Sequence, residues 1–209
     1  MRRPTCQFLL LVCTDATDPV RALLAHVRAA PTWITSIADT YALKQHVDAV
    51  EAMEWPRDTD LLCGRWELLA TTQARGAGLL RAIRRDPTLG HVDVFQDIRR
   101  DNDNDALRLD NVITVSRDDD GWRSAWTLLA PKTRSSLVLK HAATVDGLRI
   151  RARLDGIEVD GTRVGEAPQT NAALPLPGIT GDFDTTYVDG ALRIARSSGD
   201  VLRVFERIS

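Results

Sequence analysis

The chain has 209 residues, with 27 lysines and arginines against 29 aspartates and glutamates, so its formal net charge is −2. This balance lacks the basic excess of nucleic-acid-binding proteins and excludes that class. Hydrophobic residues make up 44% of the chain, which is enough to bury the core of one domain of ordinary size.

Residues 1–18 form a leader, which we expect to be either a disordered segment or a truncated targeting segment. It begins Met1-Arg2-Arg3 and contains a short apolar run at residues 8–13. A transmembrane helix needs about 20 apolar residues, and no small-residue cleavage site of a secretory signal follows the run cleanly. We therefore expect neither a transmembrane segment nor a clear transit peptide in this leader.

A helical pattern runs from residue 19 to about residue 55. Asp18 precedes Pro19, and this order suits an N-cap followed by a proline in the first helical turn. Pro31 is expected to divide the region into two helices, and Pro56 to end it. The apolar residues that recur at three- and four-residue spacings are Val20, Leu23, Leu24, Val27, Leu43, Val47 and Val50.

From about residue 61 to residue 209, short runs of alternating apolar and polar residues predict β-strands. The clearest run spans residues 147–155, where arginines alternate with apolar residues, so one face is expected to be buried and the other basic. The residues expected to face inward are Leu148, Ile150, Ala152 and Leu154 in this run, Trp66, Leu68 and Ala70, Leu107, Leu109, Ile113 and Val115 with Asn111 between them, and Trp122, Trp126 and Leu128. The basic face comprises Arg149, Arg151 and Arg153.

Asp-Gly dipeptides between such runs predict hairpins, because tight type I′ turns need a positive φ at both central residues. They start at Asp120, Asp146, Asp155, Asp160 and Asp189, and the run Ser197-Ser198-Gly199-Asp200 has the same turn chemistry. Successive hairpins predict an antiparallel meander, and a sheet of this length usually closes into a barrel or folds into a sandwich. Residues 168–177, rich in proline, are expected to form a loop before the last strands.

The first strand of this meander opens with Gly64-Arg65-Trp66. This G-x-W is similar to the motif that places an indole at the closed end of lipocalin-like barrels, where an arginine from a late strand packs on the ring. Arg193 and Arg196 are the candidates for that arginine. The alternative is an ordinary core tryptophan on a strand.

Motifs for catalysis or metal binding are weak. Residues 101–105 alternate aspartate and asparagine, but Ala106 stands where a calcium loop needs glycine and Val112 where it needs glutamate. The three cysteines are odd in number and lack metal or disulfide spacing, and no catalytic motif includes the histidines. We expect no enzyme activity, no cofactor and no metal site.

The tail carries the most specific wording: Thr186-Tyr187-Val188-Asp189, Leu192-Arg193-Ile194, Arg196, Gly199 and the strand at residues 204–207. It resembles the C-terminal signature of the plastid lipid-associated proteins, also called plastid fibrillins. Supporting matches fall upstream in the same order, at residues 64–71, 94–98 and 111–113. The resemblance covers residues 19–209, with helices over about 19–55 and the barrel over about 61–209.

This resemblance implies a mainly β fold, an antiparallel lipocalin-like β-barrel preceded by N-terminal α-helices. It implies a plastid protein at plastoglobules or thylakoids that binds or carries a hydrophobic molecule such as a carotenoid, quinone, tocopherol or acyl lipid. It also implies peripheral association with the surface of a lipid droplet or thylakoid. The charge balance, independently, predicts no nucleic-acid partner. No catalytic residue is carried over from the family.

Two groups of residues follow as hypotheses. The ligand-binding group inside the barrel is Trp66, Leu68, Gln96, Asn111, Trp126, His141 and Ile150. The structural signature is Gly64, Trp66, Tyr187, Asp189, Arg193 and Arg196. Trp122 and Trp126 could also simply fill the core, and the tail cluster of Asp184, Tyr187 and Asp189 suits either acid/base chemistry or hydrogen bonds that fix the start of a strand.

One alternative function stays open at this point. The protein could be a structural coat of lipid droplets, with a filled barrel as scaffold. In that case the N-terminal helices and the arginine face would contact acidic headgroups. An open or a packed barrel interior would distinguish the carrier from the coat.

Overall fold

The computed structural model describes residues 18–30, 32, 34, 36–72, 89–100, 107–117, 134–159, 162–166 and 181–208. The helices are α1 (Pro19–Ala29), α2 (Ile37–Glu51) and the 3-10 helix η1 (Thr59–Leu62). The strands are β1 (Gly64–Thr71), β2 (Leu89–Arg100), β3 (Leu107–Arg117), β4 (Arg134–Asp146), β5 (Arg149–Val159), β6 (Thr162–Glu166), β7 (Gly181–Val188), β8 (Leu192–Ser197) and β9 (Val201–Ile208). Residues 1–17, the 101–105 run, Trp122, Trp126, Leu128 and the 168–177 loop lie outside the described residues.

The two predicted N-terminal helices form, and each begins at a side-chain cap. Asp18 accepts a hydrogen bond from the Val20 amide at 3.0 Å, with Pro19 in the first turn. Ser36 caps α2 by accepting from the Asp39 amide at 3.0 Å. Neither helix is long and apolar enough to cross a membrane.

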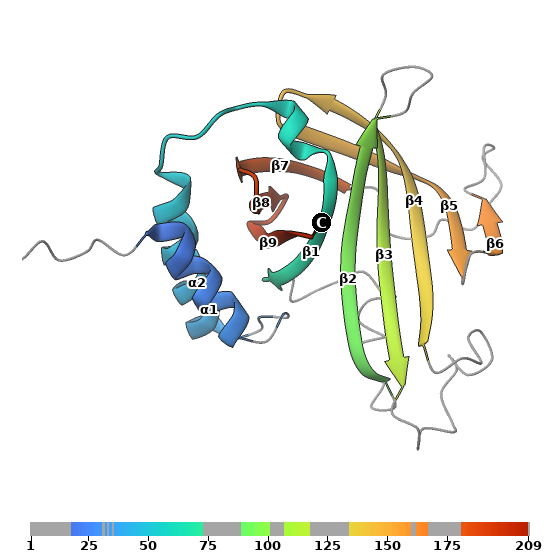
Figure 1. Cartoon of the computed structure of the whole chain (residues 1–209), viewed down its shortest axis with the longest axis horizontal. Coiled ribbons are helices and arrows are strands. Elements are labelled where there is room, and N and C mark those ends of the chain that lie inside the picture. Colours follow the sequence, from blue (N-terminus) through green and yellow to red (C-terminus); the bar gives the residue numbers. More distant parts are fainter. Residues whose placement is uncertain are drawn as a thin grey trace, which may run out of the picture.

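Eight strands close into an antiparallel ring, as predicted. The order runs β4-β3-β2-β1-β9-β8-β7-β5, and a pairing between β4 and β5 completes the circle (Figure 1). The short strand β6 pairs with the second half of β5 and lies outside this circle. Closure removes the exposed edges that a flat sheet of this length would present. The protein is therefore a mainly β, barrel-like fold preceded by two helices.

The ring consists of two half-shells joined by short seams. The long half-shell is β2–β5, whose three internal ladders have ten residue pairs each. The short half-shell is β7–β8–β9–β1. Only four pairs join β1 to β2, from Gly64↔Ile98 to Glu67↔Phe95, and four join β5 to β7. Beyond these seams the described parts of β1 and β2 pair only with β9 and β3, so the half-shells separate at the other end.

A β-bulge in β1 corrects one prediction from the alternation. Leu68 pairs with Phe205 and Ala70 with Val204, which leaves Leu69 as an extra residue. Trp66 and Leu68 therefore face the barrel interior, whereas Ala70 belongs to the cluster under the helices. The prediction that Ala70 shares the inward face was wrong, because one inserted residue reverses the side on which every later side chain lies.

The predicted turns are found at most of the described positions. Asp146-Gly147 joins β4 to β5 with Gly147 at φ +59°, and Gly199 and Asp200 join β8 to β9 at φ +80° and +58°. Asp189-Gly190 lies between β7 and β8. The hairpin predicted at Asp155 was wrong, because β5 runs through it: Lys140 pairs with Gly156 and His141 with Leu154, so Asp155 is a bulge residue.

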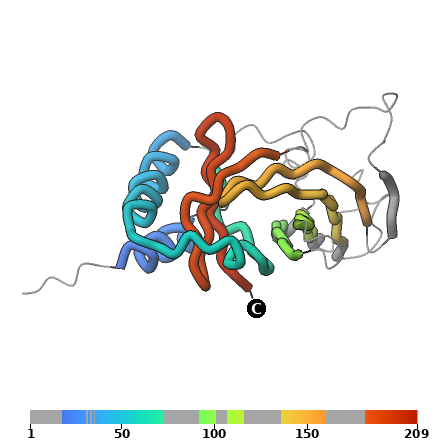
Figure 2. Tube along the Cα trace, turned by 90° about the horizontal axis from the view of Figure 1, so that it is seen from above, coloured from blue at the N-terminus to red at the C-terminus, as the bar shows by residue number. Residues whose placement is uncertain are grey.

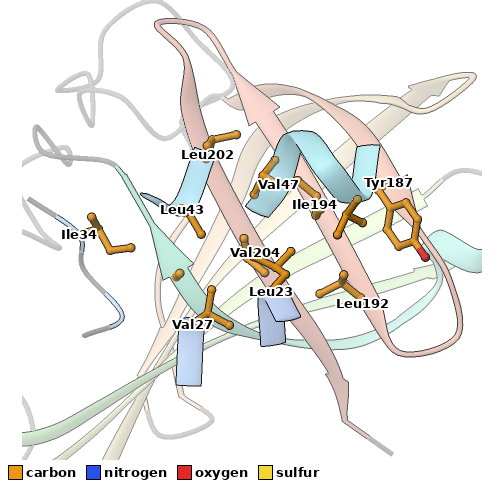
Figure 3. Packing of buried hydrophobic residues seen from close by; sticks show 12 residues of the cluster. Leu23, Val27, Ile34, Leu43, Val47, Tyr187, Leu192, Ile194, Leu202 and Val204 are labelled. Atoms are coloured by element: carbon orange, nitrogen blue, oxygen red, sulfur yellow. The ribbon is translucent and has the colours of Figure 1, made fainter. Parts of the chain in front are cut away.

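The two helices cover the outer face of the short half-shell. Figure 2 shows both helices on one side of the ring, next to the last three strands and opposite the long half-shell. Figure 3 shows the contact between helices and strands, where apolar side chains from both layers interdigitate. The fully or nearly buried members are Leu23, Val27, Ile34, Leu43, Val47, Val50, Ala70, Tyr187, Leu192, Ile194, Leu202 and Val204.

Polar contacts fix α2 on this face. Glu51, at the end of α2, accepts from Arg196 Nε at 2.9 Å and from Arg196 Nη2 at 2.7 Å, and it also accepts from the Thr186 hydroxyl. Asp48, one turn earlier, lies 2.9 Å from Arg196. Two residues of the tail signature, Thr186 and Arg196, therefore dock the helix layer.

The Glu51→Ala variant tests this docking. Removing the acceptor leaves Arg196 and Thr186 with fewer partners at a partly exposed site, so we expect a loss of about 1–2 kcal/mol in the free energy of unfolding. Urea denaturation followed by circular dichroism measures it. Glu54→Ala, at an exposed position three residues further, is the matched control. Equal midpoints for the two variants would contradict the docking role.

Candidate functional site

Trp66 forms the floor of the barrel. Its side chain is fully buried, and its indole Nε1 donates a hydrogen bond to the Leu62 carbonyl at 2.9 Å. This bond holds η1 under the ring, at the end where the two seams join the half-shells. The interior cluster around it includes Ile150, Phe183 and Phe205 from three further strands. The G-x-W strand therefore closes the barrel at one end.

Two arginines of the last strands contact the Trp66 ring. The Cζ atom of Arg207 lies 4.3 Å from the ring centroid, and that of Arg193 lies 5.3 Å from it. Arg207 also donates to the carbonyls of Leu61 at 2.6 Å and Cys63 at 2.8 Å, which ties β9 to the segment that leads into β1. Cation–π contacts and these hydrogen bonds act together in holding the floor.

Of the two arginines predicted to meet Trp66, only Arg193 does so. Arg196 points to the other side of β8, toward α2. It lies three positions from Arg193, and strand residues an odd number of positions apart face opposite sides of the sheet. The sequence reasoning missed Arg207, the closer of the two contacts. Its signal was present in the alternation of Arg203, Phe205 and Arg207 along β9.

Gly64 is required by the position of Arg207. Its φ is +147°, and a Cβ atom there would lie 2.5 Å from Arg207 Nη1. A side chain would therefore collide with the guanidinium that packs on the indole, in addition to straining the backbone. The glycine and the tryptophan of G-x-W thus serve the same contact.

A chain of polar side chains crosses the interior above this floor. Gln96 Nε2 donates to Asn111 Oδ1 at 2.9 Å, and Gln96 Oε1 accepts from Arg193 Nη2. An arginine can only donate, so it fixes the Gln96 amide with its oxygen toward Arg193 and its nitrogen toward Asn111. Asn111 in turn presents its own N–H₂ group at the far end of the chain.

Arg193 is the most unusual member. Its side chain has no solvent exposure, and its Nε and Nη1 atoms form no hydrogen bond within the described part of the chain. Burial first, and then repulsion from Arg203 and Arg207, lowers the pKa of Arg193 to about 9. At neutral pH it is still a cation, so the barrel holds a buried positive charge. The described residues place no carboxylate in an ion pair with it.

The remaining predicted interior residues face inward as well. Leu68 and Ile150 belong to the cluster around Trp66. His141 is buried, and its Nδ1 lies 3.2 Å from the Leu109 carbonyl, so that nitrogen carries the hydrogen. Trp126 lies outside the described residues. Sequence reasoning also missed Thr185, whose hydroxyl is buried on the inner side of β7 and has no hydrogen-bond partner in the described part of the chain.

Tyr187 and Asp189, by contrast, hold a turn on the outer side. The Tyr187 hydroxyl donates to Asp189 Oδ2 at 2.8 Å, and Asp189 Oδ1 accepts from the amides of Ala191 and Leu192, each at 2.7 Å. Burial and the bond to Asp189 raise the pKa of Tyr187. This pair fixes the turn from β7 into β8, and Asp184 lies apart, next to Arg149.

Metal ligands do not converge where the chain is described: no three histidine, cysteine, aspartate or glutamate side chains meet there. Cys63, at the floor of the barrel, is a free thiol whose pKa is raised by burial.

Beyond the floor, the inner wall of the long half-shell is apolar. A second interior cluster lies at the end where the half-shells separate. Inner side chains there, such as Val92, Val94, Ile157 and Val159, are only partly buried. The wall thus offers accessible apolar surface on one side of the polar chain, and the buried floor lies on the other.

The Gly64→Ala variant tests the floor. The new methyl group must displace Arg207 and accept a positive φ, so we expect a loss of about 1–3 kcal/mol in the free energy of unfolding. Gly190→Ala is the matched control, because nothing lies within 4 Å of a Cβ atom at that position. Thermal melts of both variants measure the difference, and equal melting temperatures would contradict the role assigned to Gly64.

The comparisons with known proteins identify the family. The PAP_fibrillin model matches residues 35–206, from just before α2 to the last strand. No curated protein and no solved structure gives a significant match. The family match includes G-x-W, the polar chain and the tail signature as far as residue 206, and it leaves α1 and Arg207 outside. Because it covers most of the sequence, the chain belongs to the PAP/fibrillin family of plastid lipid-associated proteins.

Proposed function

We propose that this protein binds a hydrophobic small molecule inside its barrel and carries it unchanged. The observation that supports this most is the partly accessible apolar wall of the long half-shell. Small-molecule sites combine such walls with a few fixed polar groups, and the chain from Arg193 through Gln96 to Asn111 supplies those groups.

Burial of the ligand's own apolar surface would supply most of the affinity. At about 25 cal/mol per Å² of apolar surface removed from water, a long hydrocarbon chain gains several kcal/mol from contact with such a wall. A carotenoid, quinone, tocopherol or acyl lipid has this character. The family's association with plastid lipids supports plastoglobules or thylakoids as the place where such a cargo is collected.

The absence of chemistry on the cargo is part of the proposal. The polar side chains that hydrogen-bond to one another across the described interior are one guanidinium and two amides, and none of these groups is a nucleophile. The tail pair of Tyr187 and Asp189 is engaged in a turn on the outer side. Binding therefore accounts for the interior residues better than catalysis does.

A second candidate is a coat protein on lipid droplets. Ile37 and Tyr41 favour it, because they lie one turn apart on α2 and are 90% and 65% exposed. The arginine face favours it less. Arg149 is paired with Asp182 at 2.8 Å and lies 3.8 Å from Asp184, so acidic neighbours offset part of its charge.

The Ile157→Trp variant tests the carrier. An indole at this inner position occupies space that about two methylene groups of a ligand would fill, which lowers affinity roughly tenfold at about 0.8 kcal/mol per methylene. Ligand titration followed by tryptophan quenching or calorimetry measures it. Val138→Trp, on the outer side of β4, is the control. If purified protein retains no lipid, and no carotenoid, quinone, tocopherol or acyl lipid binds, the carrier is contradicted.

Flotation with lipid droplets tests the coat. The double variant Ile37→Asp and Tyr41→Asp removes the exposed apolar pair from α2 without touching the barrel. A coat predicts that this variant stays in the aqueous fraction while wild type floats, and that soluble ligands do not bind to either. Ligand binding that is equal in both proteins, together with equal flotation, would exclude the coat.

A further inference from the structure

Arg193 is costly where it lies. A cation that is fully removed from water loses its hydration, and it normally recovers that loss from a paired carboxylate or a complete set of acceptors. Arg193 donates a hydrogen bond to Gln96 and contacts the rings of Trp66 and Phe205. Among the residues that the structure describes, its Nε and Nη1 atoms have no acceptor. A residue needed only for packing on Trp66 would not have to bring a charge into this position.

The neighbouring charges add to that cost. Arg203 and Arg207 are close enough to Arg193 to lower its pKa by repulsion. Arg203 lies on the same inner side of β9 and donates to the Ser197 hydroxyl at 3.0 Å. The interior field is therefore positive, and it favours an anion at this place over a neutral or cationic group.

The uncharged polar groups point the same way. Gln96 is held with its only acceptor turned to Arg193, and Asn111 ends the chain with N–H donors. The Thr185 hydroxyl lies on the inner side of β7 and has no hydrogen-bond partner in the described residues. The next inward-facing residue of β7 is Val188, which pairs with Arg193. The threonine hydroxyl can donate or accept, whereas the unpartnered guanidinium nitrogens of Arg193 can only donate, so a molecule bound to them must bring acceptors.

We propose that the molecule carried in the barrel is an amphiphile with a terminal carboxylate, as in a long-chain fatty acid, and that Arg193 binds this carboxylate at the closed end. This rests on the proposed carrier function and names the chemical class of its cargo. A carboxylate has a single negative charge and only acceptor oxygens, so it can accept a hydrogen bond from one of the two unpartnered guanidinium nitrogens, Nε or Nη1. A phosphate brings a third acceptor oxygen and more charge, for which the described interior offers fewer donors.

The rest of the ligand has a path along the wall. From Arg193 the inner side of the long half-shell continues through Ile150 and Leu154 to the partly buried Ile157 and Val159. The hydrocarbon chain would lie along this side and end where the half-shells separate. The headgroup would then contact the polar groups at the floor, and the tail would contact the partly buried apolar side chains of the wall.

The experiment compares ligands that differ only in the headgroup. Full-length protein, freed of lipid, is titrated with palmitic acid and with hexadecanol, which has the same chain and no charge. We expect the acid to bind at least about tenfold more tightly, since hydrogen bonds to charged groups stabilise a complex by that order. Equal affinities, or tighter binding of hexadecyl phosphate than of palmitate, would overturn the proposal.

Variants locate the headgroup. Arg193→Leu should reduce the affinity for palmitate about tenfold to a hundredfold and so remove the advantage of palmitate over hexadecanol. Arg151→Leu, on the exposed outer side of β5, is the matched control and should keep the preference for the acid. Arg193→Lys keeps the charge, so it should retain part of that preference. A preference that survives in a folded Arg193→Leu variant would overturn the assignment to Arg193.

A readout on the wild-type protein removes dependence on the folding of the variants. The carboxyl carbon of ¹³C-labelled palmitate is followed by NMR as the pH falls. Bound beside a guanidinium, the carboxyl group should stay ionised at a lower pH than it does in the free acid. A bound signal that titrates like the free acid would overturn the proposal.

Different results would contradict the carrier function and the assignment of a carboxylate ligand. If carotenoids or quinones bind and palmitate shows no advantage over hexadecanol, the carrier function stands and the carboxylate is wrong. If no apolar ligand of any class binds, the carrier function itself is wrong.

Discussion

The contact of Trp66 with two guanidinium groups is the interaction on which the rest of this barrel depends. Through this contact, β1, β8 and β9 meet η1 at one place. The indole and Arg207 together donate hydrogen bonds to three backbone carbonyls of the segment that crosses the floor. The two four-pair seams lie at this same end. Because the floor holds the half-shells together there, the long strands can separate at the other end without losing the ring.

The tail signature of the family acquires a physical explanation from this arrangement. Thr186 and Arg196 bind Glu51 and so dock α2, Asp189 fixes the turn, and Arg193 turns inward to the floor. These roles need specific side chains, unlike the many strand positions that need only a hydrophobic residue. This explains why the tail wording identified the family and the barrel-like fold, while the strands alone predicted only a meander.

The sequence predicted the strands and turns well, but it predicted less well on which side of the sheet each side chain lies. A period of two placed Leu107, Leu109 and Ile113 inward, and Asp-Gly marked the β4–β5 turn, because both patterns are local. The bulges at Leu69 and Asp155 have no comparable local signal, since they depend on register with another strand. The site followed the same rule. Alternation predicted that Asn111 and His141 face inward, as they do, whereas the choice between Arg193 and Arg196, and the contact of Arg207, required the pairing of β8 and β9.

The six residues of β8 belong to two environments at once. Leu192 and Ile194 pack under the helices, and the intervening Arg193 lies in the barrel interior, so one short strand is a shared wall between them. Any molecule that orders Arg193 also restrains the residues on which α2 rests. If binding in the interior changes the docking of the helix layer, thermodynamic reciprocity requires that a change in this docking alters the affinity of the interior by the same coupling free energy. The docking of the helix layer is in this sense a second determinant of how tightly the barrel binds a ligand.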